Sequence, residues 1–115
     1  MAIVNTSLTS TAASVYTSQG DNAITTVIVC NTSTYNSSNP TQNQSLLYLY
    51  AVPHNGGGSV GTPGSGNIIV NGLPIPAGET VTFDQEKMVL SNNDSLWAKT
   101  DSASNLVVTV STLAV

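Results

Sequence analysis

The chain has 115 residues, of which 40% are hydrophobic and only 7% are charged, and its formal net charge is −4. This length suits one small domain with one core, in which serine, threonine and asparagine supply most of the polarity. With two lysines, no arginine and no basic cluster, the chain lacks the cations that drive binding to nucleic acids and to anionic membranes. A single histidine and a single cysteine exclude zinc sites made of four cysteines, or of two cysteines and two histidines, within one chain, and we expect no metal and no other cofactor.

The first residues do not have the pattern of an export signal. They carry no basic start, and the polar run from Asn5 to Ser14 interrupts any apolar segment. No apolar stretch approaches the roughly 18 residues of a membrane-spanning helix. We therefore expect synthesis in a cytoplasm without export by that route, and residues 1–12 are expected to form an extended N-terminal arm.

Secondary structure is predicted from β-branched and aromatic residues that gather in short runs between clusters of glycine, proline, asparagine and serine. No segment has a helical pattern. The spacing predicts an all-β fold, a single antiparallel β-sandwich or jelly roll of about seven to eight short strands over residues 1–115. The expected strands are Ala13–Thr17, Ala23–Asn31, Ser45–Val52, Asn67–Val70, Glu79–Phe83, Lys87–Leu90, Ser95–Thr100 and Leu106–Leu113.

Turn chemistry adds detail to this pattern. The segment Gln19–Asn22 predicts a tight hairpin between the first two strands, because glycine and asparagine tolerate positive φ. Asn71-Gly72 is a signal for a type I′ turn. The segment Leu73–Pro76 contains two prolines and therefore two missing backbone donors, so we expect an extended crossing or edge segment there.

Two long polar segments flank the expected strand Ser45–Val52. Thr32–Gln44 has no apolar periodicity, and His54–Gly66 contains six glycines. Hairpin connections of this length are uncommon unless they are functional or disordered. We expect both to be surface loops that project from the same region or from neighbouring edges, and we expect Tyr35 and His54 to make contacts from them.

The strand Ser45–Val52 is apolar or amphipathic on both of its faces. A strand with one solvated face alternates apolar and polar residues instead. One face therefore packs on the core, and we expect the other to meet a second copy or a partner. The residues of this predicted interface are Leu46, Tyr48, Tyr50 and Val52.

Reactive side chains are few, and each has a structural interpretation beside a chemical one. His54 is either a general base or an ordinary loop residue, and we favour the latter because no acid is near it in sequence. Cys30 lies in an apolar run and is expected to be a buried hydrophobe. The carboxylates Glu79, Asp84 and Glu86 fit a solvated edge better than an acid–base pair or a calcium site. Trp97 is expected to pack in the core or an interface, although with the tyrosines it could form a sugar-stacking platform.

From about Tyr16 onward, the order of strands and turns is set by five segments: Ala23–Asn31, Leu73–Val81, Met88–Leu90, Asp94–Ala98 and Val107–Ser111. In this order of strands and turns the chain resembles small β-sandwich virion structural proteins of tailed bacteriophages.

The resemblance implies a structural role rather than catalysis. We expect a non-enzymatic virion protein, made in the host cytoplasm, that decorates or cements the capsid or serves as a neck or tail accessory protein. Its partners would be copies of itself and other virion proteins, since self-association is a common way for such chains to gain buried area. The alternative is a carbohydrate- or receptor-binding module that uses Tyr35, Tyr48, Tyr50 or Trp97 as stacking rings.

Overall fold

The fold is a β-sandwich of two antiparallel sheets, seen here in a computed structural model that describes residues 2–85, 87–101 and 105–115. Within these ranges one sheet has five strands and the other has four. The five-stranded sheet contains β1 (Ala2–Ser7), β3 (Asn22–Asn31), β6 (Thr80–Phe83), β7 (Met88–Leu90) and β9 (Leu106–Ala114). The four-stranded sheet contains β2 (Ala13–Thr17), β4 (Ser45–Val52), β5 (Ile68–Ile75) and β8 (Ser95–Thr100), and a short 3-10 turn, η1 (Ser65–Asn67), precedes β5.

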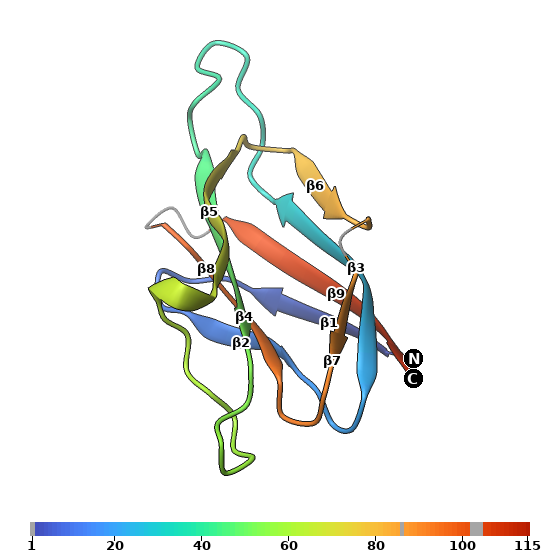
Figure 1. Cartoon of the computed structure of the whole chain (residues 1–115). Helices are drawn as coiled ribbons and strands as arrows, with labels where there is room; N and C mark the ends of the chain where they lie inside the picture. Colours follow the sequence, from blue (N-terminus) through green and yellow to red (C-terminus); the bar gives the residue numbers. More distant parts are fainter. Residues whose placement is uncertain (1, 86, 102–104) are drawn as a thin grey trace.

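The strand order places the first and last strands side by side. In the five-stranded sheet the order is β1-β9-β3, and β6 and β7 pair with successive parts of the free edge of β3. In the four-stranded sheet the order is β2-β8-β4-β5. The two chain ends consequently lie close together at one end of the sandwich (Figure 1). The prediction of an all-β sandwich is confirmed.

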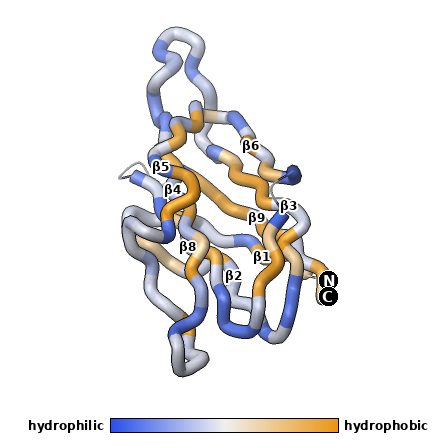
Figure 2. Tube along the Cα trace, viewed as in Figure 1, coloured by the Kyte–Doolittle hydropathy of each residue, from blue (hydrophilic) through white to orange (hydrophobic). Residues whose placement is uncertain are grey.

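The core fills the space between the two sheets, and the hydrophobic residues are concentrated in the strands rather than in the long loops (Figure 2). It is built from aliphatic side chains that alternate along the central strands, as a sheet with one buried face requires. From β3 and β9 come Val27, Val29, Val108 and Val110, and from β4 and β8 come Leu47, Leu49, Leu96 and Ala98.

The N-terminal segment differs from the prediction of an arm. Residues Ala2–Ser7 form the edge strand β1, which pairs with β9 in an unbroken antiparallel register. Only Val4 and Thr6 of this strand turn toward the interior, and both are half-buried. The few apolar residues of this segment did not indicate a strand in the sequence, and its partner strand lies at the other end of the chain.

The segment Asn71-Gly72 is not a hairpin turn. Gly72 has φ of 75° and lies inside β5, where the register with β4 skips it between Leu73 and Asn71. This is a glycine bulge, which uses the same positive φ as a type I′ turn to bend an edge strand. For Leu73–Pro76 the expectation of an edge or crossing segment agrees with the structure, because Pro74 lies in β5 at the edge of the four-stranded sheet.

The two long loops project from opposite ends of the sandwich (Figure 1), because β4 runs between them and carries the chain from one end to the other. Both are surface segments, as predicted, but the expectation that they project from the same region or from neighbouring edges is wrong. The loop after β3 is fixed by Asn31, whose side chain is 1% exposed. Its amide donates to Asn43 O and Ile75 O, each at 2.9 Å, and accepts from Ser33 N at 3.0 Å.

Candidate functional site

The outer face of the four-stranded sheet holds the predicted interface residues of β4. Leu46 and Tyr48 are half-buried, as expected for a face that is open in part. Tyr50 and Val52, however, are only 8% and 4% exposed in the single chain. Two of the four predicted residues therefore cannot present an open surface to a partner.

The chain itself covers this part of β4 with its glycine-rich loop. Gly61 is buried beside Val52, and a Cβ atom added to Gly61 would lie 3.0 Å from Val52 Cγ1 and 2.6 Å from the backbone oxygen of Pro53. Further along the same loop, Pro63, Gly64 and Ser65 line a pocket beside Tyr50. The second apolar face of β4 thus has an intramolecular explanation, which corrects the prediction that a partner covers all of it.

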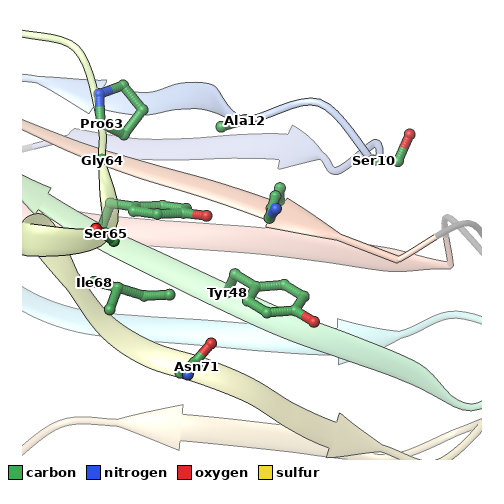
Figure 3. Close-up of a pocket in the computed structure, with 10 residues that line it drawn as sticks. Ser10, Ala12, Tyr48, Pro63, Gly64, Ser65, Ile68 and Asn71 are labelled. Atoms are coloured by element: carbon green, nitrogen blue, oxygen red, sulfur yellow. The ribbon is translucent and has the colours of Figure 1, made fainter.

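A shallow pocket of about 330 Å³ remains beside this loop (Figure 3). Tyr48 of β4 forms its floor together with Ile68 and Asn71 of β5, and Pro63 and Gly64 form one rim. Ser10 and Ala12, which precede β2, also line the pocket. The pocket combines aromatic, amide and hydroxyl groups with the ammonium group of Lys99.

The aromatic rings of this face are largely engaged within the chain. Lys99 Nζ lies 4.8 Å from the ring centroid of Tyr48, a cation–π arrangement that covers one face of the ring. Trp97 pairs with Tyr50 across the strands, is half-buried, and donates from Nε1 to Ser95 Oγ at 2.8 Å. The packing interpretation of Trp97 therefore agrees with its position, and a sugar that stacked on the face of Tyr48 below Lys99 would have to displace Lys99.

The outer face of the five-stranded sheet is open and carries no charge. We call it the neutral face and define it by the residues that alternate with the core residues of β1, β9, β3, β6 and β7. Cross-strand register arranges them in rows: Ser7, Val107, Cys30 and Thr80; Asn5, Thr109, Ile28 and Thr82; Ile3, Ser111 and Thr26; and Leu113, Ala23 and Val89.

Large apolar side chains of the neutral face are exposed among its hydroxyl groups. Ile3 and Val89 are 73% and 71% exposed, and Ile28 and Leu113 are 37% and 44% exposed. Cys30 is half-buried on this face instead of lying in the core, so its expected burial is corrected. A solvated sheet face of a monomer normally carries lysine and glutamate, and this one carries neither.

His54 has an acidic partner that the sequence did not reveal. Its Nδ1 lies 2.7 Å from Asp94 Oδ1, and its backbone N–H donates to the same oxygen at 2.9 Å. Partial burial opposes ionisation of Asp94, but these bonds and one from Ser91 N outweigh it and lower the pKa of Asp94 below its ordinary value. Asn93 Nδ2 also donates to Gly58 O at 2.6 Å. Together these bonds tie the glycine-rich loop to the turn before β8.

Apart from the His54–Asp94 pair, the described residues give little support for a metal-binding or acid–base site. No group of three His, Cys, Asp or Glu side chains in those ranges lies close enough to hold a metal ion. Glu86, one of the acids considered for such a site, lies outside the described residues, and Asp84 is exposed. Tyr35 is 52% exposed on the loop after β3, and this loop lies at the opposite end of the sandwich from the glycine-rich loop that contains His54 (Figure 1).

Comparison with protein-family models, with curated proteins and with solved structures finds no match to this chain. In the described ranges, no helix has the length and apolar character needed to cross a membrane.

Proposed function

We propose that the chain is a non-enzymatic structural protein of a tailed-bacteriophage virion, where it decorates or cements the capsid or joins the neck or tail through protein–protein contacts. The neutral face is the observation that carries this proposal. Burying it against another protein desolvates no charged group and removes exposed side chains such as Ile28 and Val89 from water. The resemblance of the strand and turn order to small virion β-sandwiches supplies the biological setting.

The test measures how much of the protein is incorporated into virus particles. Virions of the encoding phage are banded in a density gradient, and the chain is quantified in the particle fraction by mass spectrometry. Ile28→Lys places a charge in the middle of the neutral face, and we expect incorporation to fall at least tenfold. Val60→Lys is a matched control, because Val60 is 38% exposed, like Ile28 at 37%, but lies in the glycine-rich loop.

Two outcomes would overturn the proposal. One is the absence of the chain from purified particles. The other is incorporation of the Ile28→Lys variant into particles to the same extent as the unchanged chain. Thermal unfolding of both variants separates a loss of assembly from a loss of folding.

The pocket beside Tyr48 supports a second candidate function, a carbohydrate- or receptor-binding module. This shallow pocket is surrounded by an amide from Asn71, hydroxyl groups from Ser10 and Ser65, and an aromatic ring. Amides, hydroxyl groups and aromatic rings are the groups that recognise sugars. Saturation-transfer NMR with a panel of monosaccharides tests this function. Binding that Tyr48→Ala abolishes would support it, and the absence of any transfer would eliminate it.

A further inference from the structure

The four free edges of the two sheets are protected to very different extents. An exposed edge presents unpaired N–H and C=O groups to other chains, and proteins protect such edges with bulges, prolines, charges or short strands. The edge strand β5 has two register shifts, a proline and the positive φ of Gly72. The edge strand β2 has a register shift between Ser14 and Tyr16.

The third edge is divided. It consists of β6 and β7, of four and three residues, with the exposed charged residues Asp84 and Lys87 between them. Neither strand offers a long ladder to a partner.

The fourth edge, β1, has none of these protections. Its six residues pair with β9 without a register shift and include no proline, glycine or charged residue. Its outward side chain Ile3 is 73% exposed. Of the described strands, β1 hydrogen-bonds only to β9. Among the described strands, the chain thus leaves one regular, uncharged edge free.

The ladder identifies which groups of β1 are free. Leu8 N donates to Leu106 O at 2.9 Å, in the same register that pairs Ser7 with Val107. Antiparallel pairs alternate between residues that bond to each other and residues whose N–H and C=O point away. The free backbone groups therefore belong to Ile3, Asn5 and Ser7.

We infer that β1 is a self-association edge, at which a second copy of this chain adds its own β1 in antiparallel orientation. The register that uses every free group is symmetric: Asn5 pairs with Asn5 of the second copy, and Ile3 pairs with its Ser7. By symmetry, Ser7 also pairs with Ile3 of the second copy. These three pairs would form about six backbone hydrogen bonds, two at each pair.

A second copy fits this edge better than an unrelated strand for an electrostatic reason. In a two-fold contact the same surface region of both copies meets, so a region with net negative charge would repel its copy, and a chain of net charge −4 associates more readily through a region without charge. The edge β1 is such a region, and the neutral face continues directly from it through β9. The joined sheets would present one uncharged surface twice as wide, and the pair would close, because each copy uses the one unprotected edge among its described strands.

Proline substitution tests the edge without removing a ladder bond inside the chain. In Asn5→Pro the lost N–H is one that β9 does not use, and proline is tolerated at edge positions of this kind. Asn5→Ala is the matched control, because both variants lose the 2.8 Å hydrogen bond that Thr109 Oγ1 donates to Asn5 Oδ1. Sedimentation equilibrium up to about 1 mM chain should show dimers for the unchanged chain and for Asn5→Ala, and a dissociation constant at least tenfold higher for Asn5→Pro.

Cysteine pairing tests the register in a Cys30→Ser background. Facing residues of a hydrogen-bonded pair lie about 5.5 Å apart at Cα, which a disulfide can span. Chains with Ile3→Cys and chains with Ser7→Cys should each remain uncrosslinked alone and crosslink when mixed. A monomer at all concentrations, equal dissociation constants for Asn5→Pro and Asn5→Ala, or crosslinking of Ile3→Cys only with itself would each overturn the inference. The dimer would form with or without a virion, so its failure leaves the proposed function standing.

Discussion

Asn31 is the residue whose removal we expect to damage the fold most for its size. It is 1% exposed, and its side-chain amide makes hydrogen bonds to Asn43 O, Ile75 O and Ser33 N, at 2.9, 2.9 and 3.0 Å. Its backbone also donates to Glu79 O and accepts from Gly78 N. One residue thus holds the loop after β3, the end of β5 and the turn before β6.

The expected cost follows from these bonds. A buried hydrogen bond contributes about 1 kcal/mol net, and each partner left buried and unpaired adds to the loss. Replacing Asn31 by alanine removes all three side-chain bonds, so the free energy of unfolding should fall by about 3 kcal/mol. For a chain of 115 residues, 1 kcal/mol corresponds to about 4 °C in Tm, and the expected decrease is about 12 °C.

Thermal unfolding followed by circular dichroism measures this decrease. The control is Asn105→Ala, because Asn105 also donates to Asn43 O, but at 3.4 Å and in an exposed position. We expect this control to change the free energy of unfolding by less than about 0.5 kcal/mol. A difference below about 1 kcal/mol between the two variants would refute the role assigned to Asn31.

The isosteric variant Asn31→Asp tests the direction of the hydrogen bonds. It keeps the oxygen that accepts from Ser33 N but turns a carboxylate oxygen toward the two carbonyl oxygens of Asn43 and Ile75. The folded state then favours the protonated acid, which can donate to one of them, so its pKa rises above the unfolded value. Stability relative to the parent chain should be lowest at pH 7 and should recover as the pH falls through that raised pKa.

Three further predictions concern other parts of the sandwich. Among the described residues Ser45 Oγ is buried without a hydrogen-bond partner, so Ser45→Ala should raise the free energy of unfolding by about 1 kcal/mol and Tm by about 4 °C. Gly61→Ala should destabilise by about 2 kcal/mol in the same assay and speed proteolysis of the loop, because its Cβ would lie 2.6 Å from Pro53 O, whereas Gly57→Ala meets no atom within 4 Å and should be neutral. Asp94 has a lowered pKa in the folded state, so its contribution to stability is complete above about pH 4 and is lost as the pH falls through the folded value. The difference in Tm between the parent chain and Asp94→Asn should therefore be larger at pH 7 than at pH 3, and equal differences would contradict the bonds assigned to Asp94.

The strands that the sequence located best are those with turn residues at both ends. The bounds of β2, β4 and β8 agree with the prediction, because serine, asparagine, glycine or proline follows or precedes each apolar run. By contrast, β1 has only two adjacent apolar residues of large size, Ile3 and Val4, and pairs with β9 about 100 residues away. Local pattern carries no information on a partner so distant.

The contacts at the candidate sites could not be predicted from the sequence for the same reason. The double apolar character of β4 led to the prediction of a partner on its outer face, because nothing in a glycine-rich segment indicates that it lies against Val52 and beside Tyr50. Likewise, His54 and Asp94 are 40 residues apart, and only the path of the chain brings them within 2.7 Å. The neutral face becomes evident only when the register of the strands is known.

The scarcity of charge has a spatial order. Every described acidic residue, from Asp21 to Asp101, lies in a turn or beside a strand end, and Lys99 is the one charged residue within a described strand. Charge is thus concentrated in turns and beside strand ends, including the segment between β6 and β7 on one side of the sandwich, while the neutral face and its edge β1 are free of it. These charges disfavour association through the surfaces that carry them, and they impose no desolvation cost on contacts made through the neutral face and β1. The direction of assembly that this arrangement permits is therefore lateral, through β1 and the surface that continues from it.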